Sequence, residues 1–247
     1  MENEKDIPSV LYKYSAFSAN SIASLINKRI WFADPRSFND PFDCCFSILG
    51  SSPKKLKMPA SLGTEIMVEH INANLKGEEY DSQKEYRYKL EKALIDIGVL
   101  CLSSSNDNML MWSHYADNHQ GFCLGFRMIG SDIFKARMVD YAGKYIAIRI
   151  EDFADKLDRY IKDVIFNKAS DWEYEEEYRI VIDIPDGDDS KRNVKWERFM
   201  VLDSIYLGYQ MPKHYRDTIN NLFKSDSNTK IIEMEQVPGQ LHVKPNG

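Results

Sequence analysis

Short apolar runs separated by polar stretches dominate the chain, and their spacing predicts both strands and helices. Several runs have the length and apolar content of strands: 10–15, 29–33, 44–49, 98–103, 121–126, 180–184, 200–206 and 230–234. Longer segments are predicted to be helices: 19–27, 108–117, 146–168 and 212–223. Strand and helix do not alternate regularly, so we expect an α+β fold with a mixed, mostly antiparallel sheet and flanking helices.

The organisation of the chain favours one domain over residues 1–247. No internal repeat and no interdomain linker interrupts it. The polar segment at about 61–97 has few strong apolar stripes, so we expect a helical insertion there, in the position of a lid. The residues after Gln236 are expected to form a loose tail at about 237–247.

Composition narrows the class of protein. A chain of 247 residues with 43% hydrophobic residues can bury a sizeable core. The net charge of −6 gives no general attraction to phosphate backbones or anionic membranes, so nucleic acid is not favoured as a partner, although a local basic patch would permit it. The N-terminus has no signal-peptide pattern and no run is long enough to span a bilayer, so we expect a cytoplasmic protein without membrane association.

Acidic and basic residues alternate in the segment that leads into the apolar run at 180–184. In an extended conformation, Glu175, Glu177 and Arg179 would share one face, while Tyr178 and Ile180 would share the other. The two carboxylates could then act as a general base, metal ligands or acceptors for sugar hydroxyls, held ionised by Arg179. The alternative is a solvated strand surface whose charges are merely paired.

The loop at 34–43 contains two prolines, which stiffen it. Asn39 and Asp40 in this loop offer donors and acceptors that suit a small polar ligand, because little ordering entropy remains to be lost. The alternative is a structural turn in which these side chains satisfy their own backbone.

The segment at 103–116 predicts a strand end followed by an aromatic helix with Asn106 or Asp107 as its cap. At helical spacing, Trp112 and Tyr115 are expected first of all to be core residues. His114 and His119 are five residues apart, which is not the spacing of a helical zinc site, so no metal is expected. The chain has no P-loop, no dinucleotide-binding glycine motif and no nucleophile elbow.

Several blocks together resemble the prokaryotic family known as domain of unknown function 2971. They are Leu-Tyr-Lys-Tyr at 11–14, the loop at 38–43, the segments at 101–103 and 111–121, and Lys168 ahead of Trp-Glu-Tyr-Glu-Glu-Glu-Tyr-Arg at 172–179. The match spans about residues 11–208. The family name assigns no reaction.

A second, more distant similarity is to ADP-ribosyltransferase-like enzymes, which have a split sheet and cleave NAD. This similarity implies that Lys13 or Tyr14 meets the phosphates or ribose of NAD, that Ser103 lies on a middle strand, and that Glu177 acts on the nicotinamide ribose. Glu175 would deprotonate or orient the acceptor. Further residues expected to contact the co-substrate are Asn39, Asp40, Trp112, His114, Tyr115 and Arg179. The chain departs from these enzymes at Lys13, where they usually carry His or Arg.

Three functions follow as hypotheses. The first is an enzyme that transfers ADP-ribose from NAD to a macromolecular acceptor, in a toxin or phage-defence setting. The second is a non-enzymatic module that senses a small nucleotide ligand or binds a protein. The third is a magnesium-dependent nuclease that uses Asp40, Asp43, Glu175 and Glu177.

Overall fold

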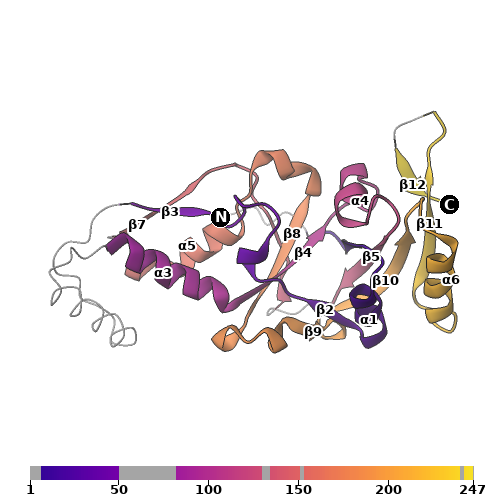
Figure 1. Cartoon of the computed structure of the whole chain (residues 1–247), viewed down its shortest axis with the longest axis horizontal. Helices are drawn as coiled ribbons and strands as arrows, with labels where there is room; N and C mark the ends of the chain where they lie inside the picture. Colours follow the sequence, from indigo (N-terminus) through magenta and orange to yellow (C-terminus); the bar gives the residue numbers. More distant parts are fainter. Residues whose placement is uncertain (1–6, 50–81, 130–133, 151–152, 240–241, 247) are drawn as a thin grey trace.

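The protein is built around an eight-stranded sheet in the order β12-β11-β10-β5-β1-β4-β8-β6 (Figure 1). The computed structural model describes residues 7–49, 82–129, 134–150, 153–239 and 242–246. The strands of this sheet are β1 (Val10–Ser15), β4 (Ile97–Ser103), β5 (Phe122–Met128), β6 (Arg137–Met138), β8 (Glu177–Asp183), β10 (Met200–Leu207), β11 (Lys230–Gln236) and β12 (Val243–Pro245). β10 and β11 pair in parallel and the other neighbours are antiparallel, so the predicted mixed, mostly antiparallel α+β class is confirmed.

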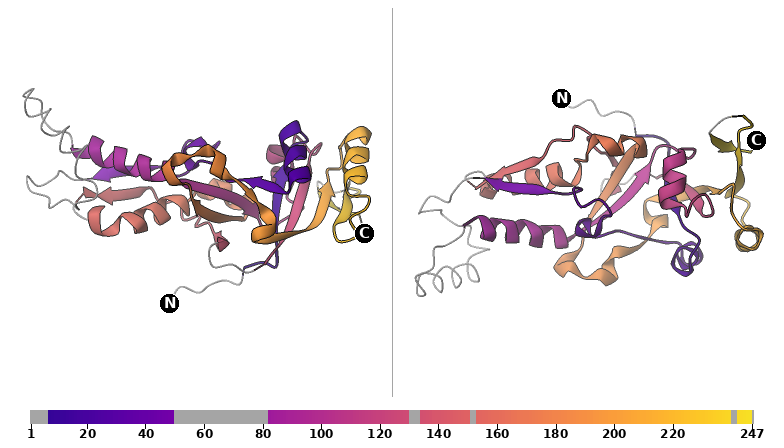
Figure 2. Two further views of the ribbon diagram at one scale, coloured as in Figure 1. Left: turned by 90° about the horizontal axis from the view of Figure 1, so that it is seen from below. Right: turned by 45° about the horizontal axis from the view of Figure 1, so that its top comes forward.

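Within the described residues, two small sheets and five α-helices surround the large sheet. β2 (Arg29–Trp31) pairs antiparallel with β9 (Asn193–Lys195), and β3 (Phe46–Leu49) pairs in parallel with β7 (Ile146–Arg149). The helices are α1 (Ala19–Asn27), α3 (Ser82–Ile95), α4 (Met109–Tyr115), α5 (Phe153–Ile165) and α6 (Lys213–Leu222). α3 and α5 pack with the β3–β7 pair at one end of the elongated molecule, and α6 packs at the other end (Figures 1 and 2).

Local sequence explains where the helices begin. Ser18 and Ser21 form a reciprocal capping box that fixes the start of α1. The predicted cap of α4 was wrong by one or two residues, because Asn108, and not Asn106 or Asp107, accepts hydrogen bonds from the backbone of Leu110 and Met111.

Two predicted elements are wrong. The segment at 146–168 is not one helix: it begins as β7, because Ile146 and Ile148 alternate with polar or small residues and Ile148 is fully buried against β3, and only then continues as α5. The segment after Gln236 is not simply a loose tail, because β12 pairs with β11 and Val243 is buried. Most of the expected insertion at 61–97 lies outside the described residues; its final part forms α3 and the start of β4.

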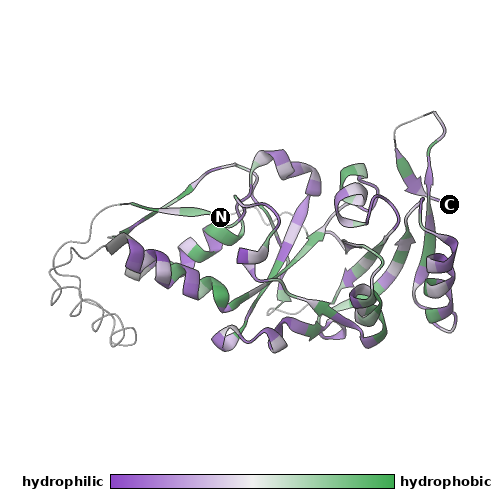
Figure 3. Ribbon diagram, viewed as in Figure 1, coloured by the Kyte–Doolittle hydropathy of each residue, from purple (hydrophilic) through white to green (hydrophobic). Residues whose placement is uncertain are grey.

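Three apolar clusters in the described part of the chain hold these elements together, and Figure 3 shows apolar residues along most of β4. The largest cluster includes Leu100, Leu102 and Ile180 on one face of the sheet. Two smaller clusters lie on the other face: Val99 belongs to the one formed with α3 and α5, and Tyr14 to the one formed with α4. Because alternate residues of a strand share a face, the residues of β4 and β8 between these two clusters are left to form a polar site.

Every strand of the large sheet pairs with its neighbours, but the pairing between β1 and β4 at the centre of the sheet is short. β1 and β4 share only the pair Tyr12 and Ser103, and towards its start β4 bridges Ala33 at Val99 instead. A split sheet of the ADP-ribosyltransferase kind is not shown by this topology. The divergence nevertheless leaves room between β1, the segment around Ala33 and β4.

We predict that Gly208→Ala destabilises the fold, because the added carbon would overlap the backbone carbonyl of His119 where the end of β10 crosses the turn before β5. Overpacking of this kind costs on the order of 1–3 kcal/mol. At roughly 2–4 °C per kcal/mol for a chain of this size, thermal unfolding followed by circular dichroism should show a clear fall in Tm. The matched control is Gly143→Ala, whose added carbon meets only the Ser170 nitrogen at 3.7 Å and carries only the strain of a positive φ. A Tm for Gly208→Ala equal to that of the wild type would contradict the close approach between Gly208 and the His119 carbonyl.

Candidate functional site

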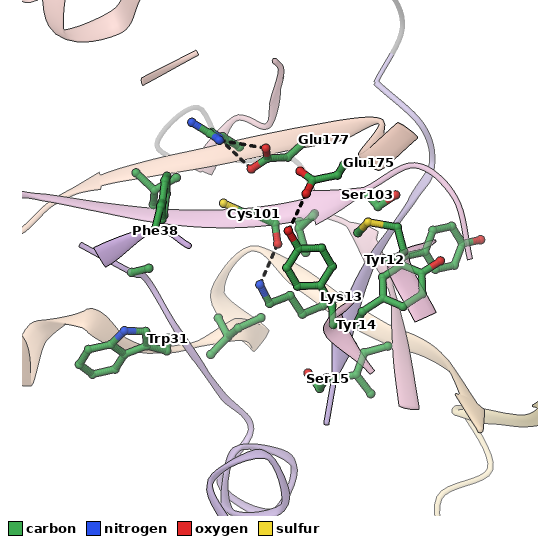
Figure 4. A pocket seen from close by; sticks show the side chains of 18 of the residues that line it. Tyr12, Lys13, Tyr14, Ser15, Trp31, Phe38, Cys101, Ser103, Glu175 and Glu177 are labelled. Carbon is green, nitrogen blue, oxygen red and sulfur yellow. Dashed lines mark hydrogen bonds and ion pairs between the residues drawn. The ribbon is translucent and has the colours of Figure 1, made fainter. Parts of the chain in front are cut away.

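A cavity of about 620 Å³ opens where β1 and β4 diverge (Figure 4). Its walls come from β1, α1, the segment at 29–39, β4, α4, β5 and the η5–β8 region, so elements far apart in the chain meet there. Here η5 denotes the 3-10 helix Ser170–Glu175. The volume lies within the range of pockets for small ligands and cofactors, which is roughly 300–1,000 Å³.

Arg179 is the centre of a buried ionic network on one wall of this cavity. Its side chain is fully buried, and its guanidinium donates to both carboxylate oxygens of Glu177 at 2.7 and 2.9 Å and to both of Asp43 at 3.0 and 2.6 Å. It also donates to the carbonyl of Ile165 at 2.5 Å and lies 5.0 Å from the ring centre of Phe38. Arg179 therefore ties β8 to the proline-containing loop and to the end of α5.

Lys168 joins a third carboxylate, that of Glu175, to this network. Its ammonium donates to Glu175 and, at 3.1 Å, to Glu177, and lies 3.5 Å from Asp43. The other oxygen of Glu175 accepts from the Tyr115 hydroxyl at 2.6 Å. Tyr115 is only partly buried, whereas Glu175 is 3% exposed, and both residues line the cavity.

The backbone brings both carboxylates to the same place although only one is on the strand. The prediction that Glu175 extends the face of the strand was wrong, because β8 begins at Glu177 and Glu175 ends η5. Between them Glu176 is left-handed, with φ 45°, and its exposed side chain accepts from Ser104 at 2.5 Å. This turn directs Glu175 and Glu177 inward and Glu176 outward.

The two buried carboxylates differ in their affinity for protons. Burial acts to raise the pKa of Glu177, but the charges and hydrogen bonds of Arg179 and Lys168 outweigh burial and lower this pKa to about 2. For Glu175 burial dominates, and its pKa is raised although Lys168 and Tyr115 oppose the shift. Burial also acts to lower the pKa of Lys168, yet the facing carboxylates raise it. The site thus combines a carboxylate that stays ionised with one that binds a proton more readily.

Across the strands, the register aligns residues from three parts of the chain. Tyr12 of β1 is opposite Ser103 of β4, and Ser103 is opposite Glu177 of β8. Next to this row, the ammonium of Lys13 donates to the carbonyl of Cys101 at 3.1 Å, across the gap between the diverging strands. Within the part of the chain that the structure describes, no carboxylate lies within 4.0 Å of that ammonium.

Most residues predicted for the site line this one cavity: Lys13, Tyr14, Asn39, Ser103, His114, Tyr115, Glu175, Glu177 and Arg179. Two others lie elsewhere. Trp112 is fully buried and donates to the carbonyl of Asn106 at 2.8 Å, so it is a core residue and cannot stack on a ligand in this arrangement. Asp40 accepts from the backbone of Phe42 at 2.9 Å, which is the structural turn that the loop also allowed.

Sequence reasoning left out some important residues of the site. Lys168 was noticed only as part of a family block, because a lysine at the end of an apolar helix gives no sign of burial. Asp43 was considered as part of the polar loop at 38–43 and as a metal ligand, whereas the structure pairs it with Arg179. Cys101 and Phe38, which also line the cavity, were not among the predicted site residues. These missed residues have one feature in common that the sequence does show: each lies in or close to the blocks at 38–43, 101–103 and 172–179.

The acidic residues proposed for magnesium are not gathered as an open carboxylate cluster. Asp43, Glu175 and Glu177 are each paired with Lys168 or Arg179, and Asp40 is not in the cavity wall. Among the described residues, no group of three or more His, Cys, Asp or Glu side chains is arranged to hold a metal ion. None of the helices that the structure describes combines the length and apolar character needed to cross a bilayer.

The fold and site define an α+β protein in which a cavity of ligand size borders a buried ionic network. A family model described as Protein of unknown function (DUF2971) matches residues 111–180, from α4 into β8, and confirms the predicted resemblance over that stretch. The comparisons give no support to the similarity with ADP-ribosyltransferases. No match is found among curated proteins or among solved structures.

We predict that Glu177→Gln lowers stability at neutral pH but not at low pH. The pKa of Glu177 falls from 4.5 to about 2 on folding, so its ionised form contributes stability above pH 4.5 that is lost as the pH falls toward 2. A shift of this size corresponds to about 3 kcal/mol. Urea unfolding at pH 7 should show a loss of that order, and the difference from the wild type should shrink between pH 5 and pH 3.

The matched control for this variant is Glu176→Gln, whose side chain is exposed between the two buried carboxylates. It should change stability little at either pH. A pH-independent difference for Glu177→Gln would mean that the ionised carboxylate is not what stabilises the fold.

Proposed function

We propose that the protein is an ADP-ribosyltransferase-like enzyme that cleaves NAD and transfers ADP-ribose to a macromolecular acceptor. The observation that carries the proposal is the row of Tyr12, Ser103 and Glu177 across three neighbouring strands, with Lys13 beside it and a cavity in front. A first-strand cation, a serine on a middle strand and a late glutamate are the residues that this chemistry would require together.

The walls of the cavity suit the parts of such a substrate. The ammonium of Lys13 has no described carboxylate partner and is available for a phosphate. Phe38 and Tyr115 offer aromatic surface for planar rings. Glu175 and Glu177 line the same cavity, so their carboxylates can accept hydrogen bonds from ribose hydroxyls. The cavity wall thus offers a cation for the phosphates and carboxylates for the reacting ribose of NAD.

The different proton affinities of the two glutamates suggest different roles. Glu177 stays ionised at neutral pH and can stabilise the positive charge that develops on the ribose carbon as its bond to the nicotinamide nitrogen breaks. The electron pair of that bond leaves with nicotinamide, and an oxygen or nitrogen of the acceptor forms the new bond to the ribose carbon.

The proton released by the acceptor also has a path. Tyr115 faces the cavity and donates to Glu175, whose pKa is raised by burial. The acceptor can pass its proton to the Tyr115 oxygen while the phenolic proton moves to Glu175, so the phenol is neutral before and after the step. Asn39 donates to the same oxygen at 3.4 Å and helps to orient it.

We predict that the purified protein releases nicotinamide from labelled NAD, and that Glu177→Gln slows this release about 100-fold or more, as expected when a group that stabilises charge in the transition state is neutralised. Glu175→Gln should reduce transfer to an acceptor more than hydrolysis of NAD. Glu176→Gln is the matched control and should retain the wild-type rate, since its side chain points away from the cavity. Wild-type protein that binds NAD without releasing nicotinamide, in the presence of candidate acceptors, would contradict the enzymatic proposal.

A non-enzymatic ligand-binding module is the second candidate. The observation that favours it is the complete pairing of Asp43, Glu175 and Glu177 by Lys168 and Arg179, because such a network can hold a pocket rigid without taking part in chemistry. Its signature is an increase in Tm that grows with ligand concentration, with no product formed.

We predict for that module that NAD raises Tm equally in the wild type and in Tyr115→Phe, since loss of the phenolic oxygen would remove proton transfer but keep the ring. A scanning-fluorimetry titration of both proteins measures this, with nicotinamide followed in the same samples. Nicotinamide release by the wild type alone would reject the module and support the enzyme.

A further inference from the structure

The outer face of the β2–β9 pair carries two cations in direct opposition. Arg29 is in register with Lys195, and like charges placed opposite one another destabilise a strand pair. Neighbouring cations are paired, Lys28 with Glu197 at 2.8 Å and Arg192 with Asp189 at 2.8 Å. Among the described residues no carboxylate lies within 4.0 Å of Arg29 or Lys195. The arrangement is unfavourable for the isolated fold, but it would be favourable with an anion bound across the pair.

An exposed aromatic ring continues this face. Trp31 is two residues from Arg29, so both side chains project to the same side of β2, and Trp31 is 50% exposed. Ile30, between them, is buried on the opposite side. Both Arg29 and Trp31 line the cavity described above, where Trp31 stands at some distance from the carboxylates (Figure 4). The outer face of the β2–β9 pair therefore extends from the protein surface to the wall of the candidate site.

We propose that this face of the β2–β9 pair binds single-stranded nucleic acid, with phosphates at Arg29 and Lys195 and a base stacked on Trp31. Cations that follow a strand and an aromatic side chain that receives a base are the two parts of such sites. An acidic peptide would satisfy the cations but would leave the exposed indole without a planar partner. The net charge of −6 means that attraction to an anion arises from this local patch and not from the protein as a whole.

The proposal rests on the proposed function only in one respect, which is that the bound strand would be the acceptor of ADP-ribose. A strand held at the rim would present an oxygen or nitrogen of a nucleotide to the cavity. Its proton would pass by way of Tyr115 to Glu175, as in the step given above. Binding itself requires neither NAD nor turnover.

Fluorescence anisotropy with labelled 12-nucleotide oligo(dT) and oligo(U), in the absence of NAD, tests the binding. We expect both to bind the full-length protein at low salt, with an affinity that falls as salt rises with a slope of roughly −0.7 for each phosphate contact. Trp31→Ala should weaken binding by about 5- to 100-fold, the range for loss of one stacked base. The two probes show whether the strand is DNA, RNA or either.

Charge reversal gives a variant that separates binding from folding. Arg29→Glu places a carboxylate opposite Lys195, which creates an attractive cross-strand pair, so Tm should be unchanged or higher while affinity falls about tenfold or more. Lys244→Glu on β12, at the far edge of the sheet, makes the same change in net charge. It loses the ion pair with Glu235 and should lower Tm, but the folded protein should keep wild-type affinity.

Equal loss of affinity in Arg29→Glu and Lys244→Glu would overturn the proposal, because net charge would then explain the binding. Failure of both oligonucleotides to bind, or tighter binding of a poly-glutamate peptide, would also overturn it. None of these outcomes depends on whether the protein releases nicotinamide from NAD. Anisotropy without NAD therefore tests the nucleic-acid site, and nicotinamide release separately tests the proposed function.

Discussion

The fully buried guanidinium of Arg179 is the constraint on which the rest of the site depends. A charge without water must be surrounded by acceptors, because the cost of removing it from water is several kcal/mol even after relaxation. Glu177, Asp43 and the carbonyl of Ile165 supply those acceptors. Each comes from a different element, so satisfying one side chain fixes the relative positions of β8, the proline-containing loop and α5.

The same network explains why polar residues can occupy the space between two apolar clusters. A buried ion pair is rarely more stabilising than a well-packed apolar substitute, so its retention is better understood as a device for positioning. Here Lys168 holds Glu175 beside Tyr115, and Tyr115 reaches the cavity. The stability of the fold and the geometry of the cavity wall therefore depend on the same few contacts.

Sequence periodicity predicted most of the sheet because alternation of apolar residues reports burial directly. β1, β8 and β10 were found in this way, and so was the α+β class. The prediction was wrong where a short strand precedes a helix, since Ile146 and Ile148 fit the apolar pattern of either, and their pairing with β3 is a long-range contact. Lys168 was missed for the related reason that burial of a charge depends on partners that periodicity does not reveal.

The left-handed turn at Glu176 has a consequence for how this region can vary. With a φ of 45°, the position lies in a region that Gly, Asn and Asp enter at low cost and that β-branched residues strongly disfavour. A Val or Ile there would favour an extended backbone and would rotate residue 175 away from Lys168. The residue types acceptable at this surface position are thus restricted by the need to keep Glu175 and Glu177 facing inward. The Glu176 side chain itself forms a described hydrogen bond only with Ser104.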